Sequence, residues 1–383
     1  MIAAALLVGQ AIALAVLIVR LLPGRRRRPP VEPLTREITD TTVSVIVATL
    51  DEAERLAPCL DGLIAQGRPL AEVLVVDSRS TDGTRELVER AARRDQRIQL
   101  LTDDPLPDGW VGKVWALEHG LRAATSEWVL GIDADTSPAP GMVAGAVTAA
   151  RNGGWSVLSF SPRFAGQTPA EQFLQPALLL TLVYRGGVVG IESDPERIVA
   201  NGQCFLARRE VLLRHGGYTP ARASFADDVT LARHLARRGE RVGFMDGSRL
   251  YTVRSYRSAR EMWREWGRSL DLKNATHPVR QWIDVAFLTA VQALPVCVVV
   301  AIAISLRSGR LSSTMAALGA VNATALAIRL LLLRPLSRSY AETHWTFWLS
   351  WLADPLAVAR IVISTVTRRR AWRGRKYAPD RGG

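Results

Sequence analysis

Two carboxylates that follow an apolar run are the residues of this chain best suited to chemistry. Residues 129–136 read VLGIDADT, so Asp133 and Asp135 end a strand-like segment and are separated by one small residue. Alternate residues of an extended backbone point to one face, and two carboxylates on one face suit a hard divalent cation that also binds phosphate oxygens. The alternative is an acidic turn that only caps the strand, and the neighbouring segments decide between the two.

Strand-like and helix-like segments alternate through the middle of the chain. The β-branched runs are expected to be strands and the amphipathic segments between them helices: strands 43–49, 72–77 and 98–102, and helices 54–66, 84–94 and 113–124. This alternation predicts an α/β fold with a mostly parallel sheet covered by helices on both faces. Ligands of such sheets bind at the carboxyl ends of the strands.

Polar residues follow three of these strands at the point where each strand ends. Residues 49–52 read TLDE, residues 77–84 read DSRSTDGT, and the third group is the acid pair described above. Each group alone is explained by a capped turn, because Asp, Ser, Thr and Gly favour turns and helix starts. Three such groups at successive strand ends favour a shared binding site over three separate turns.

The positive charge of the chain follows its apolar segments. The 383 residues carry 49 Lys and Arg against 36 Asp and Glu, a net charge of +13. Arginines 25–28 and 368–370 each follow an apolar stretch, and the sequence shows no aromatic-interleaved basic stripe, so we expect a membrane partner and no nucleic acid. The three cysteines show neither paired nor metal-ligand spacing and are interpreted as free thiols in a reducing compartment.

Both ends of the chain predict membrane segments. Residues 2–22 are long and apolar enough for an uncleaved anchor, and the arginines after it place the following domain on the cytoplasmic side of the cell (inner) membrane. Residues 283–306 and 311–333 are two further candidate spans. Residues 344–367 contain two charges and a proline, and a full span would put the basic tail outside; an interfacial or re-entrant segment is therefore preferred.

Six motifs occur in an order that resembles a known family. They read VSVIVATLDE, VLVVDSRSTDGT, GWVGKVWAL, VLGIDADT, NGQCFLARRE and FADDVTLARHLARRG. Together they resemble the family 2 glycosyltransferases with the Rossmann-like GT-A fold. The chain is most similar to the membrane-anchored branch that acts on carotenoid, hopanoid or sphingolipid-like (ceramide-type) lipids. The resemblance covers 43–277, and the ordered set is far more specific than any one motif.

The apolar segments and the resemblance together predict a multi-pass membrane protein with a cytoplasmic GT-A domain. The expected segments are an N-terminal transmembrane anchor at 1–23, a basic Pro-rich linker at 24–42, the GT-A domain at 43–257, an amphipathic interfacial helix at 258–282, C-terminal membrane segments at 283–367 with two spans and a spanning or re-entrant third, and a basic tail at 368–383.

The resemblance also assigns residues to the donor side of the site. Asp77 matches the acid that hydrogen-bonds the uracil of a nucleotide-sugar, and Ser78 stands where many relatives have a second acid. Thr49 and Glu52 match positions that line the nucleotide pocket. Lys113 resembles a basic residue near the diphosphate, although a solvated charge at a helix start explains it equally well.

The acid pair and a second pair of acids carry the chemistry that the resemblance implies. Asp135 is the expected main ligand of Mg²⁺ or Mn²⁺, while Asp133 contacts the metal, a metal-bound water or the ribose. The cation stabilises the charge on a departing nucleoside diphosphate. Asp228 is the expected general base, and Asp227, where relatives more often have Glu, belongs to the acceptor side. Capping of a helix by one of these two acids is the alternative.

The remaining acceptor-side residues are Gln203, Trp263 and Trp266. Residues 260–268 read REMWREWGR and depart from the Gln-x-x-Arg-Trp motif of many relatives. Trp263 and Trp266 share one helical face with Leu270, so an interfacial helix over the active site and a direct substrate contact are both open.

The expected function is inverting transfer of a sugar from a UDP-sugar to a membrane-lipid hydroxyl. A processive polysaccharide synthase is one alternative, but it usually needs more spans and an intact Gln-x-x-Arg-Trp motif. A noncatalytic membrane scaffold is the other, and the presence of Asp77, Asp135 and Asp228 together disfavours it.

Overall fold

The chain forms two compact units. In this computed structural model the described residues are 1–190, 194–254, 256, 258–270, 272–307, 312–367, 371–372 and 375–376. The sheet unit comprises 28–165, 192–255 and 369–383, and the helical unit comprises 1–27, 166–191 and 256–368. The basic tail predicted from 368 lies mostly outside the described residues.

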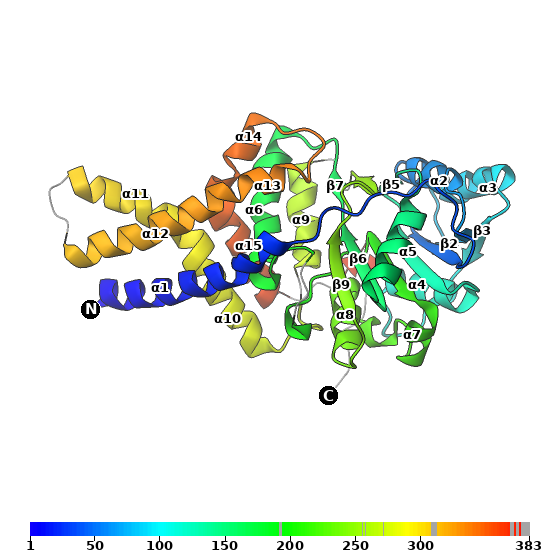
Figure 1. The fold of residues 1–383 in the computed structure, drawn as a ribbon, viewed down its shortest axis with the longest axis horizontal. Helices are drawn as coiled ribbons and strands as arrows, with labels where there is room; N and C mark the ends of the chain where they lie inside the picture. The colour runs from blue at the N-terminus through cyan, green and yellow to red at the C-terminus, as the bar shows by residue number, and fades with distance from the viewer. Residues whose placement is uncertain are drawn as a thin grey trace. The chain divides into compact units, whose positions relative to one another are not determined.

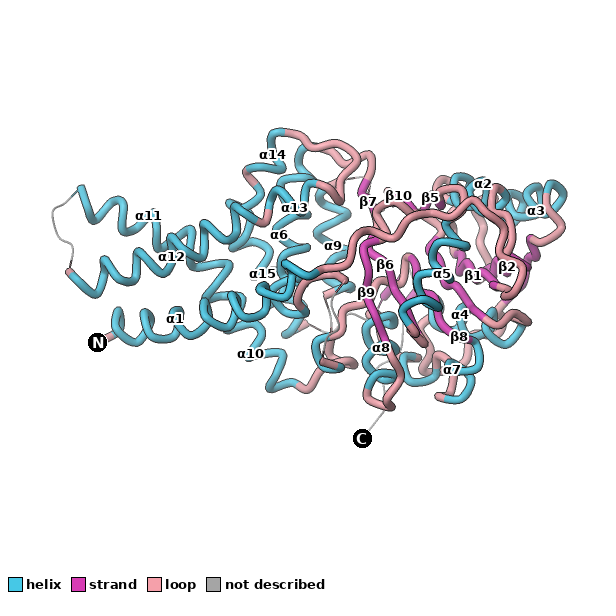
Figure 2. The backbone as a smooth tube through the Cα atoms, viewed as in Figure 1, coloured by secondary structure: helices cyan, strands magenta, loops and turns pink. Residues whose placement is uncertain are grey.

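A seven-stranded mixed sheet forms the centre of the sheet unit (Figures 1 and 2). Its order is β3-β2-β1-β4-β8-β6-β9, and β8 runs antiparallel to both of its neighbours, β4 and β6. The strands are β1 Val43–Thr49, β2 Leu70–Asp77, β3 Ile98–Thr102, β4 Trp128–Asp133, β6 Val157–Ser161, β8 Cys204–Arg208 and β9 Val242–Asp246. The three predicted strands and the mostly parallel sheet are therefore confirmed.

Two smaller sheets accompany the large one. One has three strands in the order β5-β10-β7, and the other is a two-stranded pair. Their strands are β5 Thr136–Pro138, β7 Arg163–Phe164, β10 Tyr251–Val253, β11 Ala371–Trp372 and β12 Arg375–Lys376. Because β5 starts three residues after β4 ends, Asp133 closes β4 and Asp135 lies in the tight turn between the two sheets.

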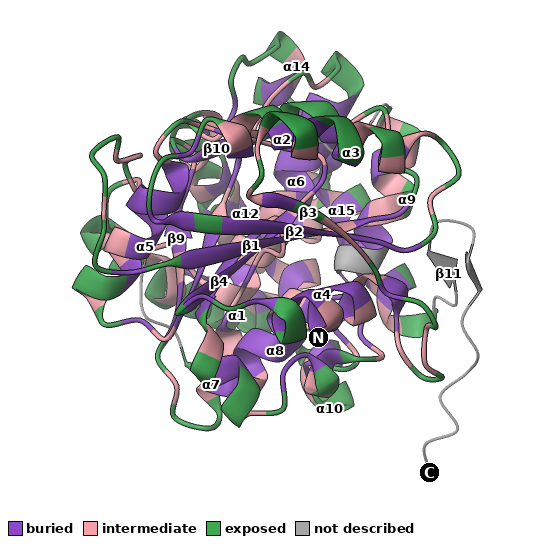
Figure 3. Cartoon of the chain, turned by 90° about the vertical axis from the view of Figure 1, so that its right-hand side faces the viewer, coloured by how far each residue is buried: buried purple, intermediate pink, exposed green. Residues whose placement is uncertain are grey.

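The central strand β1 shows why the sheet is buried on both faces. Val43, Val45 and Val47 enter one apolar cluster with side chains of α2, α3 and α5. Ile46 points to the other face, where a Cβ on Gly120 of α4 would lie 2.5 Å from its side chain. Figure 3 shows buried β1 and β2 between α2 and α3 on one side and α4 and α8 on the other. β-Branched side chains suit such a doubly covered strand.

The helices of the sheet unit follow the predicted alternation. The helix predicted at 84–94 is found with the same bounds, and the helices predicted at 54–66 and 113–124 are found with bounds that differ by one or two residues. The helical elements are α2 Leu56–Ile64, α3 Thr84–Arg94, α4 Gly112–Ala123, α5 Met142–Gly153, η2 Pro195–Arg197, α7 Arg209–Arg214, η3 Thr219–Ala221 and α8 Asp227–Ala236.

The register of the parallel strands brings their carboxyl ends together. Thr49 is paired with Asp77, and Asp77 with Thr102 on the next strand. On the other side of β1, Ala48 is paired with Asp133. The polar residues that follow three separate strands in the sequence therefore share one edge of the sheet.

The helical unit contains three helices that are long and apolar enough to cross a membrane: Ala3–Arg26, Pro278–Leu306 and Ser313–Ser337. The second is interrupted by a π-helical turn, and the start predicted at 311 for the third lies outside the described residues. The elements of this unit are α1 Ile2–Leu21, η1 Leu22–Arg26, α6 Pro169–Gly186, α9 Ala259–Ser269, α10 Pro278–Leu288, η4 Thr289–Ala293, α11 Leu294–Arg307, α12 Ser313–Leu331, α13 Leu333–Ser337, α14 Trp345–Trp348, η5 Ser350–Ala353 and α15 Asp354–Val366.

The last apolar stretch forms three short helices, α14, η5 and α15, instead of one long helix. Its two charges face protein. Asp354 is buried and accepts a hydrogen bond from Arg329 Nε at 2.7 Å, and buried Arg360 donates to the carbonyl of Trp263 at 2.9 Å. These partners explain how charges are accommodated in an apolar segment.

Helix α9 packs its two tryptophans against its own unit. Trp266 is only 6% exposed and packs in the apolar core of the helical unit with Met262 and Leu270. Trp263 is partly buried, and its ring lies 5.6 Å from the Arg360 guanidinium carbon. The face of α9 that carries both tryptophans is therefore the face that packs against the rest of the helical unit. This is the usual arrangement for an amphipathic helix, whose apolar side is buried.

Candidate active site

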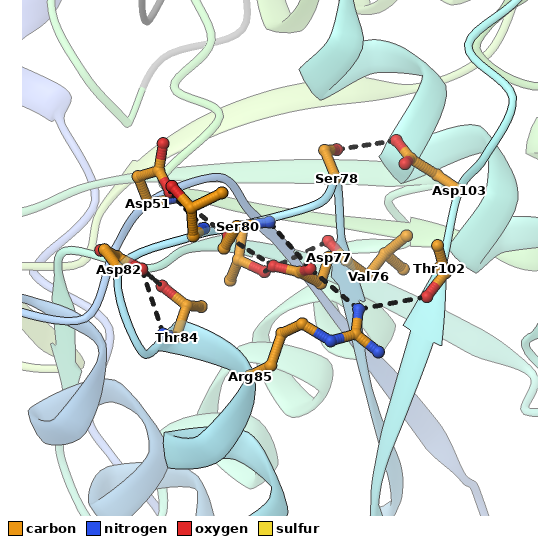
Figure 4. Close-up of polar contacts among 12 residues, drawn as sticks. Asp51, Val76, Asp77, Ser78, Ser80, Asp82, Thr84, Arg85, Thr102 and Asp103 are labelled. Atoms are coloured by element: carbon orange, nitrogen blue, oxygen red, sulfur yellow. Dashed lines mark hydrogen bonds and ion pairs between the residues drawn. The ribbon is translucent and has the colours of Figure 1, made fainter.

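The carboxylate at the end of β2 is held by its own loop (Figure 4). Asp77 is fully buried, and it accepts hydrogen bonds from the N–H of Ser80 at 3.1 Å and from the Thr49 hydroxyl at 3.3 Å. Arg85, from the first turn of α3, donates to the same carboxylate at 3.1 Å. Thr49 and Asp77 thus lie together as predicted, and Arg85 is an additional cation that the sequence reading missed.

The loops that follow β1 and β2 are bound to each other. Asp51 has a left-handed φ of 52° and accepts from the N–H of Thr81 at 2.8 Å. Buried Glu52 donates its N–H to the Thr84 hydroxyl at 2.9 Å. Burial alone would raise the pKa of Asp82, but hydrogen bonds from Thr84 and from a backbone N–H hold that pKa below its ordinary value. Hydrogen bonds therefore fix the two loops to each other at this edge.

The acid pair lies at the end of β4 and in the turn that follows it. Asp133 Oδ1 lies 2.7 Å from Lys113 Nζ in the first turn of α4, and both side chains are partly exposed. The carbonyl of Asp133 accepts from the Thr136 hydroxyl at 2.8 Å, and that of Asp135 accepts from the N–H of Arg254 at 3.4 Å. The backbone of the turn is therefore fixed on both sides of the pair.

The carboxylates of this turn fit a hard divalent cation. Among the described residues there is no group of three or more His, Cys, Asp or Glu side chains placed to hold a metal ion. Asp133 and Asp135 offer only oxygen ligands, which Mg²⁺ and Mn²⁺ prefer and which structural zinc sites rarely rely on. A cation held here would complete its shell with oxygens from a bound phosphate group or from water.

Asp228 is held at the start of α8 by two backbone groups. Its Oδ2 accepts from the N–H of Gly202 and its Oδ1 from the N–H of Val229, both at 2.7 Å. Burial and the neighbouring Asp227 raise the pKa of Asp228 to about 7, although Lys113 and these two N–H groups act in the opposite direction. A carboxylate with a pKa near neutrality suits a general base.

The turn before β8 supplies Gly202 and connects the two pairs of acids. Asn201 is fixed to β6 through the Ser159 hydroxyl, which accepts its N–H at 2.7 Å and donates to its carbonyl at 3.0 Å. Gln203 accepts from the Asn201 amide at 3.0 Å, and its carbonyl lies 3.4 Å from the N–H of Asp133. Gln203 thus lies beside the acid pair as well as beside the turn that holds Asp228.

A second anchor, missed from the sequence, fixes the loop before α8. Glu118 on α4 accepts from the N–H of Tyr218 at 2.8 Å. Gly217, with φ of 61°, packs against it so closely that a Cβ would lie 2.3 Å from Glu118 Oε2. The left-handed φ and this contact both require glycine. The HGG sequence of this loop is the signal that could have indicated it.

Asp227 lies beside a small cavity of about 10 Å³, near the lower limit for holding one water molecule. The cavity is lined by Leu117, Gly131, Gly202, Phe205, Tyr218, Asp227, Asp228 and Leu231. Asp227 is therefore buried and lines the same cavity as Asp228. Trp263 and Trp266 belong to the helical unit and contribute to its packing.

Comparison with known proteins agrees with this fold. Residues 44–216 match the family model described as glycosyl transferase family 2. The glycosyltransferase AglE of Haloferax volcanii is 32% identical over 98 residues, which are 25% of this chain and 31% of that protein. The succinoglycan biosynthesis protein ExoA of Rhizobium meliloti is 37% identical over 70 residues, 18% and 21% of the two chains. The matches thus span less than a third of either relative.

One solved structure resembles almost the whole chain. The mannosyltransferase PcManGT from Pyrobaculum calidifontis, in complex with GDP-Man and Mn²⁺, aligns with a TM-score of 0.54 over 95% of this chain and 99% of its own. The sequence identity is 20%, so the likeness concerns the fold. The predicted GT-A fold is confirmed by the family match and by this alignment.

Proposed function

We propose that this chain, whose residues 44–216 match the family model described as glycosyl transferase family 2, transfers a sugar from a nucleotide-sugar to a hydroxyl group of a membrane lipid. The observation that carries the proposal is the meeting of three groups at one sheet edge: the ordered loops around Asp77, the turn with Asp133 and Asp135, and the base candidate Asp228. Each group matches one requirement of the reaction.

The donor side binds the nucleotide and its phosphates. Asp77, Thr49 and Glu52 lie where a uracil and ribose would contact the edge, and UDP is therefore the proposed carrier. Asp135 would be the main ligand of Mg²⁺ or Mn²⁺, with Asp133 contacting the ribose or a metal-bound water. A bound cation would stabilise the negative charge that develops on the departing diphosphate.

The acceptor side supplies the base. Asp228 would take the proton of the acceptor hydroxyl while its oxygen forms a bond to the anomeric carbon and the bond to the diphosphate oxygen breaks. The hydrogen bonds from Gly202 and Val229 leave the carboxylate fixed in orientation, so its placement costs little during the reaction. A single displacement with one base inverts the configuration at the anomeric carbon.

A lipid acceptor is proposed because of the helical unit. On α1, α11 and α12 large apolar side chains remain exposed, including Val8, Ile12, Ile304 and Leu331, as expected for helices that contact acyl chains. We place the protein in the cell (inner) membrane as a multi-pass protein. The arginines at 25–28 favour a cytoplasmic sheet unit. Carotenoid, hopanoid and sphingolipid-like alcohols are the proposed acceptor classes.

A polysaccharide synthase is a second candidate, favoured by the match to the succinoglycan protein. Three candidate spans among the described residues are few for a protein that must also build a polymer channel. The length of the product separates the two functions, because a lipid glycosyltransferase adds one sugar whereas a processive synthase adds many.

The test is to incubate the detergent-solubilised chain with UDP- and GDP-sugars, Mn²⁺ and bacterial lipid extracts, and to identify products by mass spectrometry. We expect one lipid species to gain a single hexose and an equimolar amount of nucleoside diphosphate to appear. Polymer formation would support the synthase, and the absence of both product and released diphosphate would refute transferase activity.

A further inference from the structure

The cation of the site is a lysine in a chain that otherwise uses arginine. Lys and Arg together number 49, and only Lys113, Lys273 and Lys376 are lysines. An ammonium is a compact point charge, whereas a guanidinium is a broad planar fork, so the two differ wherever space is short. Lysine at position 113 is therefore unusual for this chain, and the two side chains are not interchangeable there if the site needs a compact charge.

Lys113 lies between the acid pair and the turn before β8. Its Nζ lies 2.7 Å from Asp133 Oδ1 on one side. On the other side is Gly202, where a Cβ would stand only 3.3 Å from this Nζ and 3.6 Å from Asp228 Oδ2. The ammonium and the Asp228 carboxylate therefore flank the same glycine, and that glycine also donates its N–H to Asp228.

Three carboxylates share this one ammonium. Asp133 contacts it directly at 2.7 Å, Asp228 lies across Gly202 from it, and Asp227 lines the same small cavity as Gly202 and Asp228. Asp133 comes from the acid pair of the donor side, and Asp227 and Asp228 come from α8 on the acceptor side. Lys113 thus lies electrostatically between the two halves of the site.

We propose that Lys113 is a positioning residue whose compact ammonium is the shared counter-ion of Asp133, Asp227 and Asp228, and that arginine cannot replace it. The predicted effect of Lys113 on sugar transfer rests on the proposed function. The arrangement of the lysine and the three carboxylates does not depend on it. Like-charged carboxylates repel one another, so without the ammonium both acid pairs would shift.

Two opposite binding effects follow from this arrangement. The ammonium opposes binding of a divalent cation to the acids when no donor is present, and it favours binding of the anionic diphosphate once the cation is bound. Removing the charge of Lys113 should therefore strengthen binding of the divalent cation without donor and weaken binding of the diphosphate in the presence of the cation. A general loss of structure would weaken both.

The experiment uses the full-length chain in detergent and three variants, Lys113→Met, Lys113→Arg and the control Lys273→Met. Lys273 lies in the helical unit, where its ammonium donates to the carbonyls of Ser364 and Thr367. Calorimetry measures Mn²⁺ binding without nucleotide and UDP binding with saturating Mn²⁺. Thermal unfolding verifies that each variant is folded, and Lys113→Gln replaces the methionine variant if that variant does not fold.

For Lys113→Met we expect Mn²⁺ to bind roughly fivefold more tightly and UDP roughly tenfold more weakly, on the order expected for loss of one nearby charge. For Lys113→Arg we expect Mn²⁺ affinity within about twofold of wild type, since the charge is retained, but at least a roughly tenfold lower kcat, since the fork does not fit. Lys273→Met should leave both affinities unchanged.

Several results would overturn the proposal. Weaker Mn²⁺ binding in Lys113→Met would mean that the lysine is needed only for structure, and unchanged affinities would mean that it is a solvated charge. Wild-type kcat in Lys113→Arg would refute the need for lysine. If UDP binds to neither wild type nor variants, the proposed function fails; if wild type binds UDP and Lys113→Met binds it equally well, only this inference fails.

Discussion

Buried charges are arranged differently in the two units of the chain. In the helical unit Arg329 and Asp354 are both 2% exposed, lie 2.7 Å apart and balance each other one to one. Arg329 also donates to the Ser350 hydroxyl at 3.2 Å. In the sheet unit Lys113 is the cation near three carboxylates, Asp133, Asp227 and Asp228. One cluster is balanced and the other carries excess negative charge.

The difference separates a structural use of charge from a ligand-binding use. A balanced and fully buried pair has no electrostatic need for a further ion, and it connects α12 to α15. The cluster around Lys113 has excess carboxylate and is partly open to solvent. Such a cluster attracts a divalent cation, and it can also bind an anionic ligand together with that cation. Substitutions in the two clusters should therefore fail in different ways.

The largest effect is expected at the base. Asp228→Asn keeps the shape of the side chain but cannot accept a proton, so the transfer rate should fall by about 10²–10⁴-fold. Binding of UDP with Mn²⁺ should persist, because Asp228 does not contact the donor in the proposed mechanism. Product formation by mass spectrometry and calorimetry of UDP measure the two. Undiminished turnover in this variant would eliminate Asp228 as the base.

A stability effect is expected at the balanced pair. Arg329→Met leaves the Asp354 carboxylate buried without its partner, which should lower the free energy of unfolding by about 3–5 kcal/mol. The matched control is Arg151→Met, which breaks the exposed ion pair with Asp40 at 2.7 Å and should leave the free energy of unfolding nearly unchanged, because water screens an exposed pair.

Thermal unfolding in detergent compares these two variants, and UDP affinity should be unaltered in both while they remain folded. Equal destabilisation by Arg329→Met and Arg151→Met would contradict the structural importance assigned to the buried pair.

The smallest effect is expected from pH. A general base must be ionised to act, and the pKa of Asp228 is raised to about 7. The transfer rate should therefore fall with decreasing pH below about 7, by roughly tenfold per unit, and level off above it. Initial rates between pH 5.5 and 8.5 at saturating donor measure this. A rate that is flat across that range would show that no group titrating near neutrality controls the step.

Much of the fold was predictable because local patterns and global burial agree. β-Branched runs such as 43–49 become strands, since a strand covered on both faces needs apolar side chains in both directions. The three strand-end groups meet because parallel register brings carboxyl ends together. Antiparallel β8 was not foreseen, because its apolar run does not reveal its direction.

The contacts within the site were less predictable. Gly202 and Glu118 fix Asp228 and its loop through backbone hydrogen bonds between segments that are distant in sequence, and no local pattern encodes such pairings. Trp266 gives another example: the amphipathic pattern of its helix does not reveal that this side chain is buried in the core of the helical unit. The Lys113 ion pair was also invisible, since its partner lies twenty residues away.

Binding of UDP in the presence and absence of a divalent cation tests the central claim most directly. With Mn²⁺ we expect saturable UDP binding by wild type, abolished by chelator and by Asp135→Asn and preserved in Asp228→Asn, because the excess carboxylates bind the diphosphate only through a cation. UDP binding of equal strength in chelator, or in Asp135→Asn, would contradict the role of this sheet edge as a metal-dependent donor site.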